Sequence, residues 1–164
     1  MDGGNLAGVG LMPAPRPRGG AMPEISRTVT VDQPLERVWT FLTDFTTTEE
    51  WDPPTVSTER ISGDGTEGTV YRNVSKVLGH ETEVEYTVLT FAPMREFVLE
   101  GRTTGLELLD TLEFEGDDRR TTVTYTAEFS PQGAAKLAEP LMPVALKKIG
   151  DDAAESMERT LESL

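Results

Sequence analysis

Apolar and polar side chains alternate along residues 25–31, ISRTVTV, with the two-residue period of a β-strand. Similar runs recur between residues 55 and 129, and Gly, Pro and Asp residues typical of turns separate them. These runs predict further strands near residues 55–61, 69–78, 81–91, 95–103, 106–115 and 120–129. Because short turns join successive strands, we expect them to pair antiparallel. The pattern therefore predicts one sheet of about seven strands.

Helical spacing replaces alternation directly after the first strand. In residues 35–42, LERVWTFL, apolar side chains recur every three or four positions, and Asp32 precedes them where a helix cap is expected. Asp44 is a candidate cap for a second short helix, which Pro53 and Pro54 end. The sequence thus predicts two short helices between the first two strands.

The last segment of the chain predicts one long amphipathic helix of about 20 residues, because its apolar side chains recur at helical spacing. Pro140 and Pro143 mark its start, and Gly150 lies inside it, which indicates a bend or the close approach of another segment. The apolar stripe consists of Leu141, Ala145, Ile149, Ala153, Met157, Leu161 and Leu164.

The chain has 164 residues, a length typical of one domain. Residues 1–23 are rich in Gly and Pro and predict a flexible leader, so we expect a single folded domain over residues 24–164. Fifteen Lys and Arg against twenty-nine Asp and Glu give a net charge of -14. This charge repels phosphate groups and therefore argues against a nucleic-acid partner.

Metal and membrane chemistry have little support in the sequence. There is no cysteine and only one histidine, His80, which leaves no disulfide, no cysteine-ligated zinc and no site built on two imidazoles. We expect neither a metal nor a cofactor. No apolar run is long enough to cross a bilayer as a helix, and the first residues lack a secretory signal, so we expect no membrane insertion and a cytoplasmic location. The oligomeric state stays open.

Four stretches of the chain resemble the START-related, polyketide-cyclase-like superfamily (SRPBCC). They are VWTFLTDFTTTEEWDP (38–53), ETEVEYTVLTFAPMREFVLEG (81–101), DDRRTTVTYTAEF (117–129) and LKKIGDDAAESMERTL (146–161). The resemblance covers about residues 25–164 and implies an α+β helix-grip fold. In that fold a curved antiparallel sheet of seven strands wraps around a long C-terminal helix, with two short helices after strand one. It also implies an apolar, ligand-sized cavity between sheet and helix.

An acidic residue interrupts an apolar strand face. In residues 106–115, Asp110 shares its face with Leu106, Leu108, Leu112 and Phe114. If Asp110 is desolvated, its pKa should rise, and it becomes a candidate general acid or base, or an anchor for a ligand hydroxyl. Alternatively it pairs with an arginine, for which Arg27 is a candidate, or it lies in water near the strand end.

The cavity that the resemblance implies is expected to be lined by side chains that face the long helix or project from it. Tyr86 and Tyr125 lie on apolar strand faces, Trp51 precedes the proline-rich loop, and the long helix adds the methionines Met142 and Met157. Plain core packing is the alternative for each of these residues. The predicted lining is Trp51, Tyr86, Leu108, Asp110, Leu112, Tyr125, Met142, Leu146, Ile149 and Met157.

Members of the superfamily that look alike at this level include lipid carriers, polyketide cyclases and hormone receptors. The resemblance therefore leads first to a domain that binds a hydrophobic or aromatic small molecule, such as a lipid, a polyketide or a similar metabolite. A second hypothesis is a cofactor-independent polyketide cyclase or dehydratase that uses Asp110 and a pocket tyrosine. A third is a protein-interaction module, which predicts an exposed apolar patch instead of a cavity.

Overall fold

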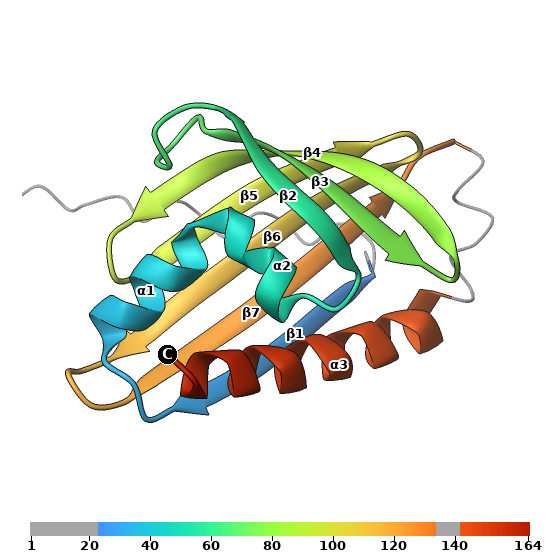
Figure 1. Cartoon of the computed structure of the whole chain (residues 1–164). Coiled ribbons are helices and arrows are strands. Elements are labelled where there is room, and N and C mark those ends of the chain that lie inside the picture. Colours follow the sequence, from blue (N-terminus) through green and yellow to red (C-terminus); the bar gives the residue numbers. More distant parts are fainter. Residues whose placement is uncertain (1–22, 134–141) are drawn as a thin grey trace, which may run out of the picture.

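A curved antiparallel sheet forms most of the molecule (Figure 1). The computed structural model describes residues 23–133 and 142–164, and for residues 142 and 143 it describes the backbone only. The strand order across the sheet is β1-β7-β6-β5-β4-β3-β2. The strands are β1 (Glu24–Val31), β2 (Thr55–Ser62), β3 (Val70–Val77), β4 (His80–Ala92), β5 (Glu96–Thr103), β6 (Leu106–Gly116) and β7 (Thr121–Pro131).

Two short helical segments and one long helix complete the fold, which is the predicted helix-grip architecture. Helix α1 (Leu35–Thr43) is followed by a 3-10 turn, η1 (Phe45–Thr47), and by α2 (Thr48–Trp51). The long helix α3 (Met142–Glu162) runs beside β1 (Figure 1). Its predicted beginning at residue 140 lies outside the described residues. The predicted leader lies there too, except for Pro23, and the domain boundary stays a prediction.

The predicted cap at Asp32 is wrong, and Asp44 caps the 3-10 turn η1 instead of α2, whose N-cap is Thr47. Pro34 occupies the N-cap of α1, and no side chain caps the helix. The Leu35 N–H instead donates to the carbonyl of Asp117 in the β6–β7 turn, at 2.8 Å. Asp44 accepts a hydrogen bond from the Thr46 N–H at 3.1 Å and so caps η1.

Gly150 lets α3 lie directly against β1. A Cβ atom at this position would collide with Ile25 Cγ2 and would lie 3.2 Å from the guanidinium carbon of Arg27. Of the two roles predicted for this glycine, the structure shows the close approach. Near the other end of the helix, Gln33 donates to the carbonyl of Leu164 at 3.3 Å, so α3 runs parallel to β1.

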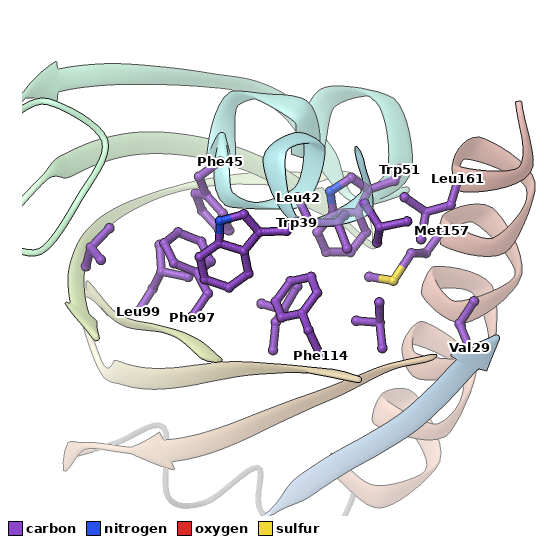
Figure 2. Close-up of a cluster of buried hydrophobic side chains, with 14 of the residues drawn as sticks. Val29, Trp39, Leu42, Phe45, Trp51, Phe97, Leu99, Phe114, Met157 and Leu161 are labelled. Atoms are coloured by element: carbon purple, nitrogen blue, oxygen red, sulfur yellow. The ribbon is translucent and has the colours of Figure 1, made fainter. Parts of the chain in front are cut away.

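The core lies where α1, α2 and the second half of α3 meet the sheet, and Figure 2 shows side chains from all of them converging. Trp39 packs edge-on against Phe114, with ring centroids 4.9 Å apart. Met157 and Leu161 reach this cluster from α3 and are fully buried. The helices and the sheet are therefore joined at one end by dense apolar packing.

The outer face of β1 and β7 carries a ladder of hydroxyl groups. Directly paired residues of the two strands join their side-chain oxygens across the ladder at 2.9 to 3.2 Å. The pairs are Ser26 with Thr126, Thr28 with Thr124, and Thr30 with Thr122. These bonds help to fix the register of the first strand on the last.

Candidate functional site

Asp110 lies near the middle of β6, on the face of the sheet that carries the core. Its relative exposure is 5%. Leu108 and Leu112, two positions away on either side, are buried on the same face, whereas Glu107 and Glu113 are exposed. The strand parity expected from the sequence is therefore confirmed, and the carboxyl group is removed from water.

The hydroxyl groups of two tyrosine side chains approach Asp110, one from each side, and hydrogen bonding to them lowers the pKa of its carboxyl group. Tyr86 comes from β4 and Tyr125 from β7. Tyr125 pairs with Leu112 in the ladder, so it lies one diagonal step from Asp110. Tyr86 is two strands away and must cross β5 to reach the carboxyl group. The sequence analysis combined Asp110 with one pocket tyrosine, and the structure brings both candidate tyrosines to it.

Gly101 makes the reach of Tyr86 possible. It pairs with Tyr86 on one side and with Leu108 on the other. A Cβ atom at Gly101 would lie only 2.7 Å from Tyr86 Cε1 and 3.0 Å from Cδ1, closer than side-chain atoms approach one another. The tyrosine ring thus lies over the glycine backbone. A glycine inside a strand pattern is a signal for such close approach, and it was available in the sequence.

A second carboxyl group faces the cluster from α2. Asp52 follows the last residue of this helix, and its charge acts on Asp110, Tyr86 and Tyr125. The sequence analysis did not identify Asp52 as a site residue; it directly precedes the prolines that end the second helix. Trp51 was already a predicted lining residue, so an acidic residue directly after it could have been recognised as a second candidate for the site.

Asp52 is held by a chain of buried and half-buried polar groups. Thr55 Oγ1 donates to Asp52 Oδ2 at 2.6 Å and accepts from Asn73 Nδ2 at 3.0 Å. The same Asn73 amide reaches Thr58 Oγ1 at 2.9 Å, and Thr58 shares a hydrogen bond with Thr48 at 2.6 Å. The network ties α2 to β2 and β3, so the position of Asp52 is fixed relative to the sheet.

Burial raises the pKa of both carboxyl groups. The pKa of Asp110 rises from 3.8 to about 7, first because of desolvation and then because of the charge of Asp52, while the two tyrosine hydrogen bonds oppose the shift. Desolvation raises the pKa of Asp52 to about 6, opposed by the Thr55 hydrogen bond. Desolvation and then Asp110 raise the pKa values of Tyr86 and Tyr125 well above 10, so both remain donors at neutral pH.

The predicted pairing of Asp110 with Arg27 is wrong. Arg27 Nε lies 3.0 Å from Asp151 Oδ1, because α3 passes beside β1 and offers its own carboxylate. Within residues 23–133 and 142–164, no Lys or Arg forms an ion pair with Asp110. The carboxyl group is instead satisfied by neutral hydroxyl groups, and it does not lie in water.

Aromatic rings surround the two tyrosines. Phe45 packs edge-on against Tyr86 at a centroid distance of 4.9 Å, and Trp51 packs against Tyr125 at 5.8 Å. Trp51 is 2% exposed, and its Nε1 has no hydrogen-bond partner among the described residues. The candidate site is thus a small polar centre with apolar walls, in which one buried donor is left unused.

The remaining predicted lining residues occupy different places. Leu108, Leu112 and Met157 are buried in the same core cluster as Tyr86. Leu146 is buried too, but it lines a separate cleft of about 190 Å³ with Ile25, Arg27 and the start of β1. Ile149 is half-buried. Met142 begins α3, and its side chain lies outside the described residues.

A larger cleft, of about 540 Å³, lies between the α1–η1 segment and the β2–β3 turn. The sequence pattern gave no sign of it. Tyr71 and Phe91 form part of its wall, and Tyr71 also packs edge-on against Phe45 at 5.5 Å. Because Phe45 touches both Tyr71 and Tyr86, its ring separates this cleft from the Asp110 cluster.

This arrangement can hold the polar end of an otherwise apolar molecule. A carboxyl group with a pKa near 7 can also take up or release a proton at physiological pH. Within the described residues, no group of three or more His, Asp or Glu side chains is placed to hold a metal ion. In the same part of the chain, no helix combines the length and apolarity needed to span a membrane.

Solved structures with the same architecture cover most of this chain. The Zhui aromatase/cyclase from Streptomyces sp. R1128 has 18% identity and a TM-score of 0.70, over 87% of this chain and 93% of its own. A START superfamily protein from Mycobacterium smegmatis has 15% identity and a TM-score of 0.71, over 85% and 97%. A conserved protein from Geobacillus kaustophilus has 14% identity and a TM-score of 0.67, over 86% and 96%. At these identities the likeness shows the fold alone.

The sheet, the two short helical segments and the long terminal helix define a START-like helix-grip domain. Residues 22–162 match the family described as polyketide cyclase / dehydrase and lipid transport, and the chain belongs to this family. No curated protein is significantly similar to the sequence. Membership of this family implies a START-like ligand-binding fold. It does not identify the ligand, whose chemical class is inferred below from the residues of the site.

Proposed function

We propose that the domain binds a hydrophobic or aromatic small molecule, such as a lipid, a polyketide or a similar metabolite, in an internal cavity between the sheet and α3. Asp110 carries this proposal. It is a nearly fully buried carboxyl group that two tyrosines hold, without an ion-pair partner in the described part of the chain. Burying such a group costs stability, and perturbed carboxyl groups concentrate at functional sites.

The apolar surroundings of Asp110 support a mainly hydrophobic ligand. Leu108 and Leu112 flank it along β6, and Ala127 and Leu99 lie opposite it on the neighbouring strands. Burial of apolar ligand surface supplies most of the binding free energy in such sites, while a few polar groups fix orientation. Asp110 and its tyrosines would supply that orientation.

Native mass spectrometry of the protein purified from its source tests the proposal, followed by denaturing release and identification of any bound molecule. A stoichiometric apolar or aromatic ligand is the expected result. The purified protein should also bind members of a lipid and aromatic polyketide panel. The proposal fails if no ligand is found and no member of the panel binds.

A second candidate function is a cofactor-independent polyketide cyclisation or dehydration, and the raised pKa of Asp110 favours it. Ring closure requires removal of a proton next to a carbonyl group, and dehydration requires protonation of a leaving hydroxyl. A carboxyl group with a pKa of about 7, hydrogen-bonded to Tyr86 and Tyr125, suits either step. The similarity of the fold to an aromatase/cyclase is consistent with this candidate.

Turnover of a bound polyketide-like molecule distinguishes the two candidates. If the domain is a cyclase or dehydratase, Asp110→Asn should abolish product formation while leaving binding within about tenfold, because the amide keeps the shape of the side chain. Glu113→Gln, on the exposed face of the same strand, is the matched control and should retain activity. If product forms equally in all three proteins, Asp110 is not the acid or base.

A further inference from the structure

Negative charge dominates the surroundings of Asp110. Asp52 faces it from the end of α2, and the other groups in contact, Tyr86 on β4 and Tyr125 on β7, are uncharged donors. The net charge of the whole chain, -14, adds to this local field. Two acidic groups therefore share one desolvated site without a compensating cation from residues 23–133 or 142–164.

The basic side chains of β1 and of the first half of α3 that form ion pairs have acidic partners from α3. Arg27 lies 3.0 Å from Asp151, and Lys147 lies 3.1 Å from the same carboxylate. Lys148 lies 2.7 Å from Asp152. Recruiting any of them to neutralise a bound anion would break an existing pair.

Above about pH 7 both carboxyl groups are largely ionised, because their pKa values are about 7 for Asp110 and about 6 for Asp52. An anionic ligand end would then place a third negative charge beside them. A hydroxyl or ammonium group meets the opposite situation, because it can donate a hydrogen bond to a carboxylate oxygen, which accepts more than one. An ammonium group also offers the cation that the carboxyl pair lacks.

We infer that the site selects its ligand by charge: it takes an apolar molecule whose polar end donates hydrogen bonds and is neutral or cationic, and it excludes carboxylates. The inference rests on the proposed binding function and narrows its ligand class. Free fatty acids and other anionic amphiphiles are thereby excluded, whereas alcohols, phenols and amines with an apolar body fit.

Three probes with one ring system test the inference: 1-naphthylmethylamine, 1-naphthylmethanol and 1-naphthoic acid. Their dissociation constants are measured at about pH 7.5 by displacement of the uncharged dye N-phenyl-1-naphthylamine. We expect the amine to bind at least about 100-fold more tightly than the acid, with the alcohol between them, because an uncompensated buried charge costs about that factor or more.

Matched variants show whether the carboxyl pair causes the selectivity. Asp110→Asn and Asp52→Asn should each reduce the amine-to-acid ratio by about tenfold or more, whereas Glu113→Gln, which removes one exposed charge from β6, should leave it unchanged. About 0.5 M NaCl should leave the wild-type ratio nearly unchanged, because buried charges are screened less than the field of the whole protein.

The possible outcomes distinguish a failure of charge selection from a failure of the proposed binding function. Equal affinity for amine and acid, or a ratio that salt or Glu113→Gln abolishes, overturns charge selection while the binding function stands. If the dye does not bind and titration calorimetry detects none of the three probes, the binding function fails and the inference fails with it.

Discussion

Asparagine in place of Asp110 should change how stability depends on pH. The native pKa of Asp110 is about 7, above the ordinary value of 3.8 that the unfolded chain is expected to show. Between these two values the native protein holds a proton that the unfolded chain has released. The contribution of Asp110 to stability is therefore full below about pH 4, declines as the pH rises through 7, and stays lost above it.

The size of this stability change follows from the size of the Asp110 pKa shift. A difference of about 3 pH units corresponds to roughly 4 kcal/mol at 1.36 kcal/mol per unit. At 5% exposure, solvent screening of Asp110 is small. Asparagine removes the charge but fits the tyrosine hydroxyls less well, which costs about 1 kcal/mol. At pH 5 the wild type has already lost roughly 1.6 kcal/mol of the Asp110 contribution, so Asp110→Asn should be more stable than wild type there by less than about 1 kcal/mol, and by roughly 3 kcal/mol at pH 8.

Urea unfolding followed by circular dichroism at both pH values measures the difference. The acidic surface also makes stability fall as the pH rises, but this background is common to both proteins. Glu113→Gln corrects for the loss of one negative charge, since it removes a charge from the outer face of the same strand. If the gap between wild type and Asp110→Asn is the same at pH 5 and pH 8, Asp110 is not desolvated as the structure indicates.

Three further perturbations bear on the site and on its support. Gly101→Ala should cost about 1 to 3 kcal/mol in urea unfolding, because the new methyl group overlaps the Tyr86 ring, and an equal cost in a Tyr86→Leu background would contradict this. Tyr125→Phe removes a hydrogen bond that stabilises the Asp110 carboxylate, so carboxyl NMR titration should show a higher Asp110 pKa; an unchanged value would exclude that bond. Gly150→Ala should lower the melting temperature despite the better helix propensity of alanine, and a rise would refute the close packing of α3 on β1.

The local pattern of the chain was sufficient to predict the strands and the side chains that face inward. Alternation placed Asp110 on the buried face of β6, because side-chain direction in a strand depends only on position along it. Asp44 was recognised as a cap for the same reason, since its hydrogen bond reaches only two residues along the chain.

The site itself depends on contacts between distant residues. Asp52 faces Asp110 only because a polar network seats α2 on β2 and β3, and alternation carries no information about that docking. Arg27 was one possible partner for Asp110 because it lies on the apolar face of the first strand, yet its partner comes from α3, 124 residues away. Tyr86 reaches across a strand only because Gly101 lacks a side chain.

The position of β1 beside β7 affects how the chain can fold. Strands β2 to β7 follow one another across the sheet, so each can pair with a neighbour that is adjacent in sequence. The first strand instead pairs with residues about 90 to 100 positions later, and α3 can settle on it only after that pairing. Contacts this far apart in sequence close slowly. During synthesis β1 must therefore wait, without its partner strand, until β7 has emerged from the ribosome.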